Sequence, residues 1–275
     1  IALNAQNKIE FKKDKTSPNI QVLINKKAFT SFFFPDTLDK PVLYPISAPD
    51  GNIITRGFPL MPKVGDATDH PHHIGIWLNY ENVNGLDFWN NSFAIPKEKK
   101  SQYGSVKMTG TPSYKSGKEG TLNYTANWVN SSSDILLNES KKYTDDKGIV
   151  TTVVATKDSI ANGNYINSNG IQGEDVWSKK ATWCMLYGKM GKDSISIAIL
   201  DHPKNIGYPT NWHARGYGLF AANPLGEKIF TNGKAERNLT LQKGESVTFK
   251  YRIVIASGSK RLDNDVIEKL QKSFN

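Results

Sequence analysis

Several features that often define a protein's class are scarce or missing in this sequence. Its 275 residues include one cysteine, Cys184, so an intrachain disulfide and zinc-finger spacing are both excluded. We interpret this cysteine as a small buried hydrophobic residue. No stretch approaches the roughly 20 consecutive apolar residues of a membrane helix, so we expect no membrane span. Glycine-rich phosphate loops, nucleophile elbows and metalloprotease helix motifs are also missing, which argues against nucleotide, esterase and peptidase functions.

Positive charge is abundant but dispersed. The formal net charge is +9, from 35 Lys and Arg against 26 Asp and Glu. The lysines occur as scattered pairs and one short run at 96–100, without the interleaved aromatic residues of nucleic-acid binding. We therefore expect a solvated lysine-rich surface and no nucleic-acid partner. The sequence begins at Ile1 rather than Met, and we expect a periplasmic or otherwise exported protein whose signal peptide is not in view.

Alternation of apolar and polar residues with a period of two dominates the chain and predicts strands. Clear examples occupy 20–25, 148–156, 194–200 and 246–257, with turn residues between them. One helix is predicted at 263–274, where Val266, Leu270 and Phe274 recur every four residues behind an Asp or Asn cap. We predict an all-β fold: one large antiparallel β-sandwich domain over 1–275, with a short C-terminal helix.

The stretch DHPHHIGIWLNY, residues 69–80, holds three of the five histidines. If 73–80 is a strand, successive side chains alternate between two faces. The core face then carries Ile74, Ile76 and Leu78. The other face carries His73, Gly75, Trp77 and Asn79, which supply a titratable ring, a glycine gap open to a ligand, an aromatic ring and an amide. We predict that the second face lines a solvent-accessible cleft. His72 falls on the core side, and His70 precedes Pro71 at the entrance of the strand.

A second group of polar residues lies in DHPKNIGYPTNWHARGYGLFAANPLG, residues 201–226. If residues 212–220 form a strand, then His213, Arg215 and Tyr217 lie on one face of it. These three polar side chains are costly to bury without partners. We therefore expect His70, His73, His213 and Arg215 to converge on one polar cleft. His213→Ala should then abolish turnover, and Arg215→Lys should weaken binding because an ammonium lacks the planar fork.

These two motifs, with KPVLYPISAPDGNIITRGFP upstream of them, resemble the PmoA family, a bacterial domain of unknown function labelled "methane oxygenase PmoA". The resemblance runs over roughly residues 17–258. Ile74 stands where many members carry Arg, so a role for that arginine does not carry over. The label implies a membrane enzyme, which the missing span argues against. The resemblance instead implies a galactose-mutarotase-like supersandwich and carbohydrate chemistry.

The residue types agree with a carbohydrate partner, because sugars are held by aromatic faces and bidentate polar groups. We predict an enzyme resembling a glycoside hydrolase, lyase or epimerase, with no cofactor and with histidine acting as general acid or base. The predicted catalytic residues are His70, His73, His213 and Arg215. The predicted substrate-binding residues are Arg56, Trp77, Asn79, Trp89, Tyr217 and Asn223. The carboxylates available to assist a histidine are Asp69, Asp87, Glu139 and Glu174.

Two alternatives remain open. His70 with His72, or His72 and His73 with Asp69, offer ligands for a transition metal, although strand parity would point His72 and His73 to opposite faces. A noncatalytic carbohydrate-binding module would need the aromatic residues and Arg215 but no proton transfer. Loss of the histidines would then weaken binding without affecting any turnover.

Overall fold

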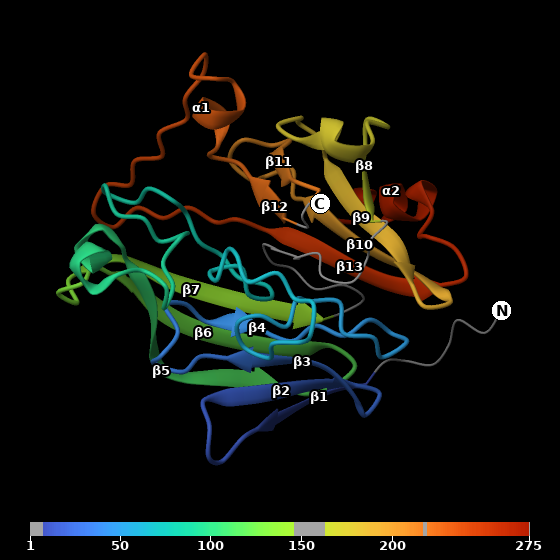
Figure 1. The fold of residues 1–275 in the computed structure, drawn as a ribbon, viewed down its shortest axis with the longest axis horizontal. Coiled ribbons are helices and arrows are strands. Elements are labelled where there is room, and N and C mark those ends of the chain that lie inside the picture. The colour runs from blue at the N-terminus through green and yellow to red at the C-terminus, as the bar shows by residue number, and fades with distance from the viewer. Residues whose placement is uncertain (1–7, 146–162, 217–218, 275) are drawn as a thin grey trace. The chain divides into compact units, whose positions relative to one another are not determined.

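The computed structural model of the chain describes residues 8–145, 163–216 and 219–274 and is built mainly of antiparallel strands (Figure 1). The predicted all-β class with a short C-terminal helix is confirmed. The strands are β1 (Ile9–Lys13), β2 (Asn19–Ile24), β3 (Lys27–Phe33), β4 (Val42–Leu43), β5 (Ser105–Lys115), β6 (Gly120–Val129), β7 (Ile135–Asp145), β8 (Asn164–Asn167), β9 (Trp183–Met190), β10 (Asp193–Asp201), β11 (Asn211–Ala214), β12 (Phe220–Asn223) and β13 (Tyr251–Gly258). The helices are α1 (Glu227–Phe230) and α2 (Asn264–Lys272), with 3₁₀ turns η1 (Lys97–Gln102) and η2 (Gly173–Val176).

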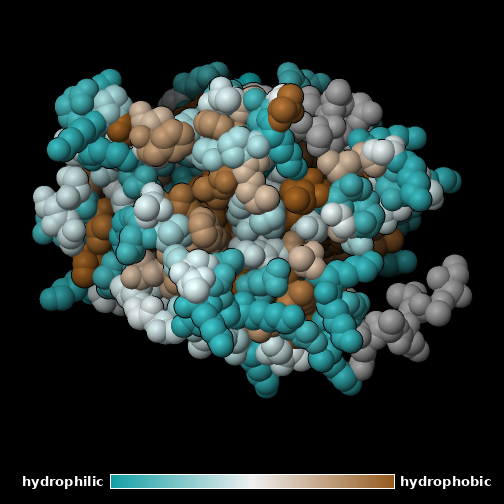
Figure 2. Space-filling model, turned by 60° about the horizontal axis from the view of Figure 1, so that its bottom comes forward, coloured by the Kyte–Doolittle hydropathy of each residue, from teal (hydrophilic) through white to brown (hydrophobic). Residues whose placement is uncertain are grey.

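The chain divides into two compact units. Unit 1 comprises Ile1–Ser47 and Gly51–Lys147, and unit 2 comprises Ala48–Asp50 and Gly148–Asn275. Each unit is described by itself below, and the expectation of one domain over 1–275 stays a prediction. Hydrophilic side chains cover most of the molecular face shown in Figure 2, with hydrophobic ones visible between them. None of the described helices combines the length and apolar character needed to cross a bilayer.

Unit 1 contains two antiparallel sheets, ordered β1-β2-β3-β4 and β5-β6-β7. Alternate residues of β2 enter the core, with Ile20 0% and Val22 7% exposed. Phe32 from β3 stacks on Tyr124 from β6 at 4.8 Å between ring centroids, so the two sheets share an aromatic core. The long connection between β4 and β5 has isolated bridges and η1 but no extended ladder, and it carries the histidine stretch.

Unit 2 contains a sheet ordered β13-β10-β9-β8 and the β11-β12 hairpin. The predicted C-terminal helix forms, and the Asp263 carboxylate caps it by accepting from the Asp265 amide. Ile267 and Phe274 pack into a core with strands β8, β9, β10 and β13. Val266, expected on the apolar face, is 41% exposed instead.

The predicted strands meet different outcomes. Those at 20–25 and 194–200 are confirmed as β2 and β10. The one at 246–257 is a strand only from Tyr251 onwards, and residues 246–250 do not pair with a neighbouring strand. The one at 148–156 lies outside the described residues.

Candidate active site

The histidine stretch is an irregular turn and not the strand we predicted. His70 has φ +46°, and the His73 amide donates to the His70 carbonyl across Pro71 at 2.9 Å. Among the described residues, the one β-bridge of this stretch joins Ile76 to Leu43 in both directions, with both N–H···O distances 3.0 Å. The alternating-face argument therefore fails, because proline removes a donor and left-handed residues interrupt the extended backbone.

Both sides of this turn are buried. Exposure is 2% for His73, 1% for Trp77 and 7% for Asn79, comparable to 5% for Ile74 and 2% for Ile76. The predicted solvent-accessible cleft along His73, Trp77 and Asn79 is therefore wrong. Asn79 donates to the Phe88 carbonyl at 2.7 Å, a structural bond rather than a ligand contact.

The glycine gap expected to admit a ligand is filled by the protein itself. Gly75 has φ +59°, and a Cβ at this position would overlap the Leu43 carbonyl oxygen. Glycine is required because the two backbones approach closely at the Ile76 bridge.

Arg56, predicted to bind substrate, instead holds the turn in place. Its side chain is 5% exposed. Its guanidinium donates to five backbone carbonyls, those of Phe58, Ala67, Asp69, His70 and His73, and to the Asp69 carboxylate. A planar group with several fixed donors suits this role, so Arg56 is a positioning residue for the turn.

The three imidazoles are packed against one another. The His70 ring stacks on His73 at 5.0 Å, and the His72 ring meets His73 edge-on at 4.2 Å between centroids. The expectation that His72 and His73 point to opposite faces is therefore wrong. Burial, with the neighbouring positive charges, lowers the pKa of His72 to about 3 and that of His73 to about 2. Both rings are neutral at physiological pH, so His73 does not supply the near-neutral titration we predicted.

The more exposed His70 is held differently, by the Asp69 carboxylate at 2.7 Å from Nδ1. Of the four carboxylates proposed to assist a histidine, Asp69 therefore makes such a contact. No three His, Cys, Asp or Glu side chains in the described ranges are grouped so that they could hold a metal ion. The arrangement of these histidines therefore gives the metal-site alternative no support.

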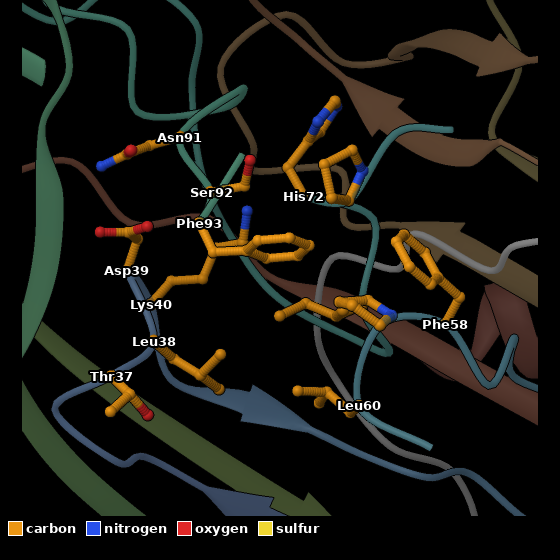
Figure 3. Close-up of a pocket in the computed structure, with 13 residues that line it drawn as sticks. Thr37, Leu38, Asp39, Lys40, Phe58, Leu60, His72, Asn91, Ser92 and Phe93 are labelled. Carbon is orange, nitrogen blue, oxygen red and sulfur yellow. The ribbon is translucent and has the colours of Figure 1, made fainter. Parts of the chain in front are cut away.

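A cavity of about 220 Å³ lies next to the imidazoles, within unit 1 (Figure 3). Its walls come from the β3–β4 connection, the loop before the histidine turn, the turn itself and the 91–93 segment. The lining residues are Thr37, Leu38, Asp39, Lys40, Phe58, Pro59, Leu60, Pro71, His72, Ile74, Asn91, Ser92 and Phe93. Phe93 is 68% exposed, an unusual exposure for a large aromatic residue at a pocket.

Lys40 is the main residue of this pocket that our sequence reasoning missed. Only 3% of it is exposed, and Figure 3 shows its amine extending into the pocket on the side of Ser92 and His72. The amine lies 3.6 Å from the Trp77 ring centroid and makes one long bond, 3.4 Å, to the Trp89 carbonyl. Trp77 and Trp89 thus surround this lysine, whereas we had predicted that they hold a sugar.

No carboxylate among the described residues pairs with the Lys40 amine. Burial lowers the pKa of Lys40 to about 7, although the charges of Asp39 and Asp87 oppose this effect. The adjacent Asp39 is engaged elsewhere, accepting from the Ser105 hydroxyl at 2.9 Å and lying 3.6 Å from the Lys100 amine. Lys40 is therefore an amine that takes up and releases protons near neutral pH.

Ser92 adds a second unsatisfied group to the pocket wall. This residue is 6% exposed, and its buried hydroxyl has no hydrogen-bond partner within the described part of the chain. Buried polar groups are nearly always bonded, so such a hydroxyl in a pocket indicates a place for a ligand. The sequence offers only a faint signal for Lys40 itself, which is its place directly before Pro41 and the apolar run at 42–46.

In unit 2 the predicted strand at 212–220 is a hairpin. β11 ends at Ala214, and the Arg215 amide bonds the Leu219 carbonyl at 3.0 Å before β12 begins. Within β11 the predicted alternation holds, because Trp212 and Ala214 are fully buried while His213 is half-buried. Tyr217 lies outside the described residues.

Trp177 from the loop after η2 brings His213 and Arg215 together. The Arg215 guanidinium lies 3.5 Å from the Trp177 ring centroid, and the His213 ring meets the same indole edge-on at 4.5 Å. Burial and the charge of Arg215 lower the pKa of His213 to about 4. Asn223, a predicted sugar ligand, accepts from the Leu225 amide at 3.3 Å.

His70 and His73 belong to unit 1, whereas His213 and Arg215 belong to unit 2. Their convergence on one cleft stays a prediction.

Fold and site together define an all-β protein with a small pocket built around a buried amine. The chain belongs to a family of unknown function, DUF6807, whose model matches residues 19–155 and 144–272. No curated protein and no solved structure matches the chain.

Proposed function

We propose that unit 1 holds the active site of a carbohydrate-processing enzyme, in which Lys40 moves a proton on a single sugar ring bound in the pocket. One observation carries the proposal. The Lys40 amine enters a cavity of about 220 Å³, is 3% exposed and has no carboxylate partner among the described residues. An unpaired buried amine costs stability, and such a cost is typical of functional sites.

The proposed chemistry follows from the ionisation of this amine. With a pKa of about 7, Lys40 is divided between amine and ammonium at neutral pH. A general base or acid works best when its pKa lies near the operating pH. His72, a neutral imidazole on the same wall, and the Ser92 hydroxyl supply hydrogen bonds that orient a substrate hydroxyl or carbonyl group.

The size and lining of the pocket support a single sugar ring. Sites for drug-sized ligands measure roughly 300–1,000 Å³, so a cavity of about 220 Å³ favours a smaller occupant. Phe58 and the exposed Phe93 offer aromatic faces, and Ser92 and His72 offer polar contacts. The resemblance of three sequence motifs to the PmoA family, and through it to galactose-mutarotase-like proteins, supports the choice of a sugar.

Within this class, proton transfer is favoured over glycoside hydrolysis. Glycosidases typically use two carboxyl groups, about 5–10 Å apart, on either side of the bond. Asp39 is the one carboxylate among the described residues of the wall, and it is bonded to Ser105 and close to Lys100. We therefore propose epimerase, isomerase or lyase-type chemistry, with Lys40 as the base.

A screen of the purified chain against monosaccharides and sugar acids tests this proposal. Incubation in deuterated buffer at pH 7, followed by NMR spectroscopy, reports both new products and exchange of carbon-bound protons. We expect at least one compound to react, and Lys40→Met to slow that reaction by about 100-fold or more, the usual contribution of a general base. Lys115→Met is the matched control, because Lys115 is exposed on β5 of the same unit.

Full activity of Lys40→Met would refute the role of the lysine. Binding of a sugar without any reaction would instead identify unit 1 as a noncatalytic carbohydrate-binding module.

A further inference from the structure

Two groups that the described residues satisfy poorly or not at all enter the same small pocket of unit 1. They are the Lys40 amine, which lies on the Trp77 ring and makes one long bond to the Trp89 carbonyl, and the buried hydroxyl of Ser92, which has no hydrogen-bond partner in the described part of the chain. From this geometry we infer that Lys40 is a nucleophile that captures the carbonyl group of a small hydroxy-aldehyde or hydroxy-ketone as an imine. This inference rests on the proposed function, that the pocket processes a sugar, and specifies it further: the substrate is the open-chain form, and Lys40 acts first as a covalent nucleophile rather than as the base.

The surroundings of the amine favour attack on carbon. Lysines become nucleophilic when an apolar pocket desolvates them and leaves the nitrogen lone pair unprotonated. The indole ring of Trp77 covers one side of the Lys40 amine at 3.6 Å, and the long bond to the Trp89 carbonyl restrains it only weakly. The amine is therefore available to a ligand that enters the cavity.

The reaction needs no oxidant, reductant or bound cofactor. The Lys40 nitrogen forms a bond to the carbonyl carbon, and the carbonyl oxygen takes up the proton that the nitrogen loses. The resulting carbinolamine then loses its hydroxyl group, which leaves as water together with the remaining proton of the nitrogen, while the nitrogen lone pair forms the C=N bond. The Ser92 hydroxyl is available to donate to the carbonyl oxygen during attack. The imine makes the adjacent C–H bond more acidic, which is the property that an isomerase, an epimerase or a lyase uses.

The pH dependence of capture depends on the charges that face the amine. Asp39 and Asp87 stabilise the ammonium form, and Lys100 offsets part of the Asp39 charge. The neighbouring imidazoles of His72 and His73 are neutral above about pH 4 and add no charge there. Lys40 is about half unprotonated at pH 7. An exposed lysine, whose pKa is near 10.4, has an unprotonated fraction about a thousandfold smaller.

Reductive trapping of the full chain tests the inference. The protein is incubated at pH 7 with D-glyceraldehyde, or separately with D-xylose, in the presence of sodium cyanoborohydride, and the adducts are located by peptide mass spectrometry. We expect the Lys40 peptide to be modified at least about tenfold faster than any exposed lysine, allowing for restricted access to the pocket. Because all lysines are compared within the wild-type chain, the result does not depend on the folding of a variant.

A parallel experiment separates imine formation from sugar binding. Methyl β-D-xyloside cannot open to an aldehyde, so any binding of this compound to the pocket involves no imine. We measure whether this glycoside, or a panel of related methyl glycosides, slows acetylation of Lys40 by acetic anhydride. Protection of Lys40 without any trapped adduct would overturn the imine and leave the proposed sugar site standing. Adducts confined to exposed lysines, with no protection of Lys40, would overturn both.

Discussion

Lys40→Met removes the buried amine while keeping a flexible side chain of similar length in the same space. Lys40 is 3% exposed and its amine has no carboxylate partner among the described residues, so the wild-type fold bears the cost of a poorly solvated ammonium. Replacement of even a buried ion pair by apolar side chains of similar volume is often neutral or stabilising by about 1–4 kcal/mol, and Lys40 lacks the carboxylate of such a pair among the described residues. We expect Lys40→Met to be more stable than the wild type at pH 6.5.

The pH dependence of this difference is the sharper prediction. The folded-state pKa of Lys40 is about 7, lowered by burial, against 10.5 in the unfolded chain. Between pH 7 and pH 10.5 the unfolded state binds more protons than the folded state, so the stability of the wild type rises with pH. Below pH 7 Lys40 is protonated in both states, and the full cost of burying its ammonium is present. From pH 6.5 to pH 9 the wild type therefore gains about 2.5 kcal/mol from this residue, and Lys40→Met gains nothing from it.

Urea unfolding of both proteins at pH 6.5, 7.5 and 9 measures this difference. Lys141→Met is the matched control, because the Lys141 side chain in unit 1 is also largely removed from solvent, at 11% exposed, but lies 2.9 Å from the Glu139 carboxylate. Burial alone would lower the pKa of Lys141, but Glu139 and Tyr143 together outweigh that effect and raise it. Lys141→Met should therefore destabilise the fold at every pH. A stability difference between Lys40→Met and wild type that stays constant from pH 6.5 to pH 9 would refute the reasoning.

Three further substitutions probe the histidine turn, each by urea unfolding. Arg56→Lys should lower the free energy of unfolding by about 3 kcal/mol or more, because an ammonium cannot replace the bonds to five carbonyls; a loss below about 1 kcal/mol would contradict this role. Between pH 7 and pH 5 the wild type should lose about 2 kcal/mol of unfolding free energy through His73, because burial lowers the folded pKa of this ring to about 2 and near pH 5 the ring is protonated only in the unfolded chain. His73→Leu should not show this loss. Gly75→Ala should destabilise by about 3 kcal/mol or more, because its Cβ would overlap the Leu43 carbonyl. Gly85→Ala, which also has positive φ but open space around it, should cost clearly less.

The parts of the fold that follow local rules were predictable from sequence. Alternation identified β2 and β10, although β10 is buried on both faces from Ile195 onwards, and the predicted Asp or Asn cap of α2 is Asp263. Alternation failed at 73–80 because the stretch lies in a long connection whose conformation is set from elsewhere. Arg56 and the backbone of Leu43 fix this turn.

The candidate site depended even more on distant contacts. Lys40 is buried by Trp77 and by Trp89, which is 49 residues further along the chain, so the residues next to Lys40 in the sequence give little indication that its amine is desolvated. The histidines attracted attention as titratable groups, yet their mutual packing and burial keep His72 and His73 neutral. The sequence therefore drew attention to His72, which lines the pocket, but not to Lys40 beside it.

Titration of the Lys40 side chain is the most direct measurement of the central claim, that this pocket holds an amine active near neutral pH. NMR spectra of protein labelled with ¹³C at the lysine ε-carbons, recorded from pH 5.5 to pH 10.5, report each amine separately, and Lys40→Met assigns the signal. We predict one lysine signal with a midpoint near pH 7 that is missing from Lys40→Met. A Lys40 midpoint near 10.4, the value of a solvated lysine, would contradict the account.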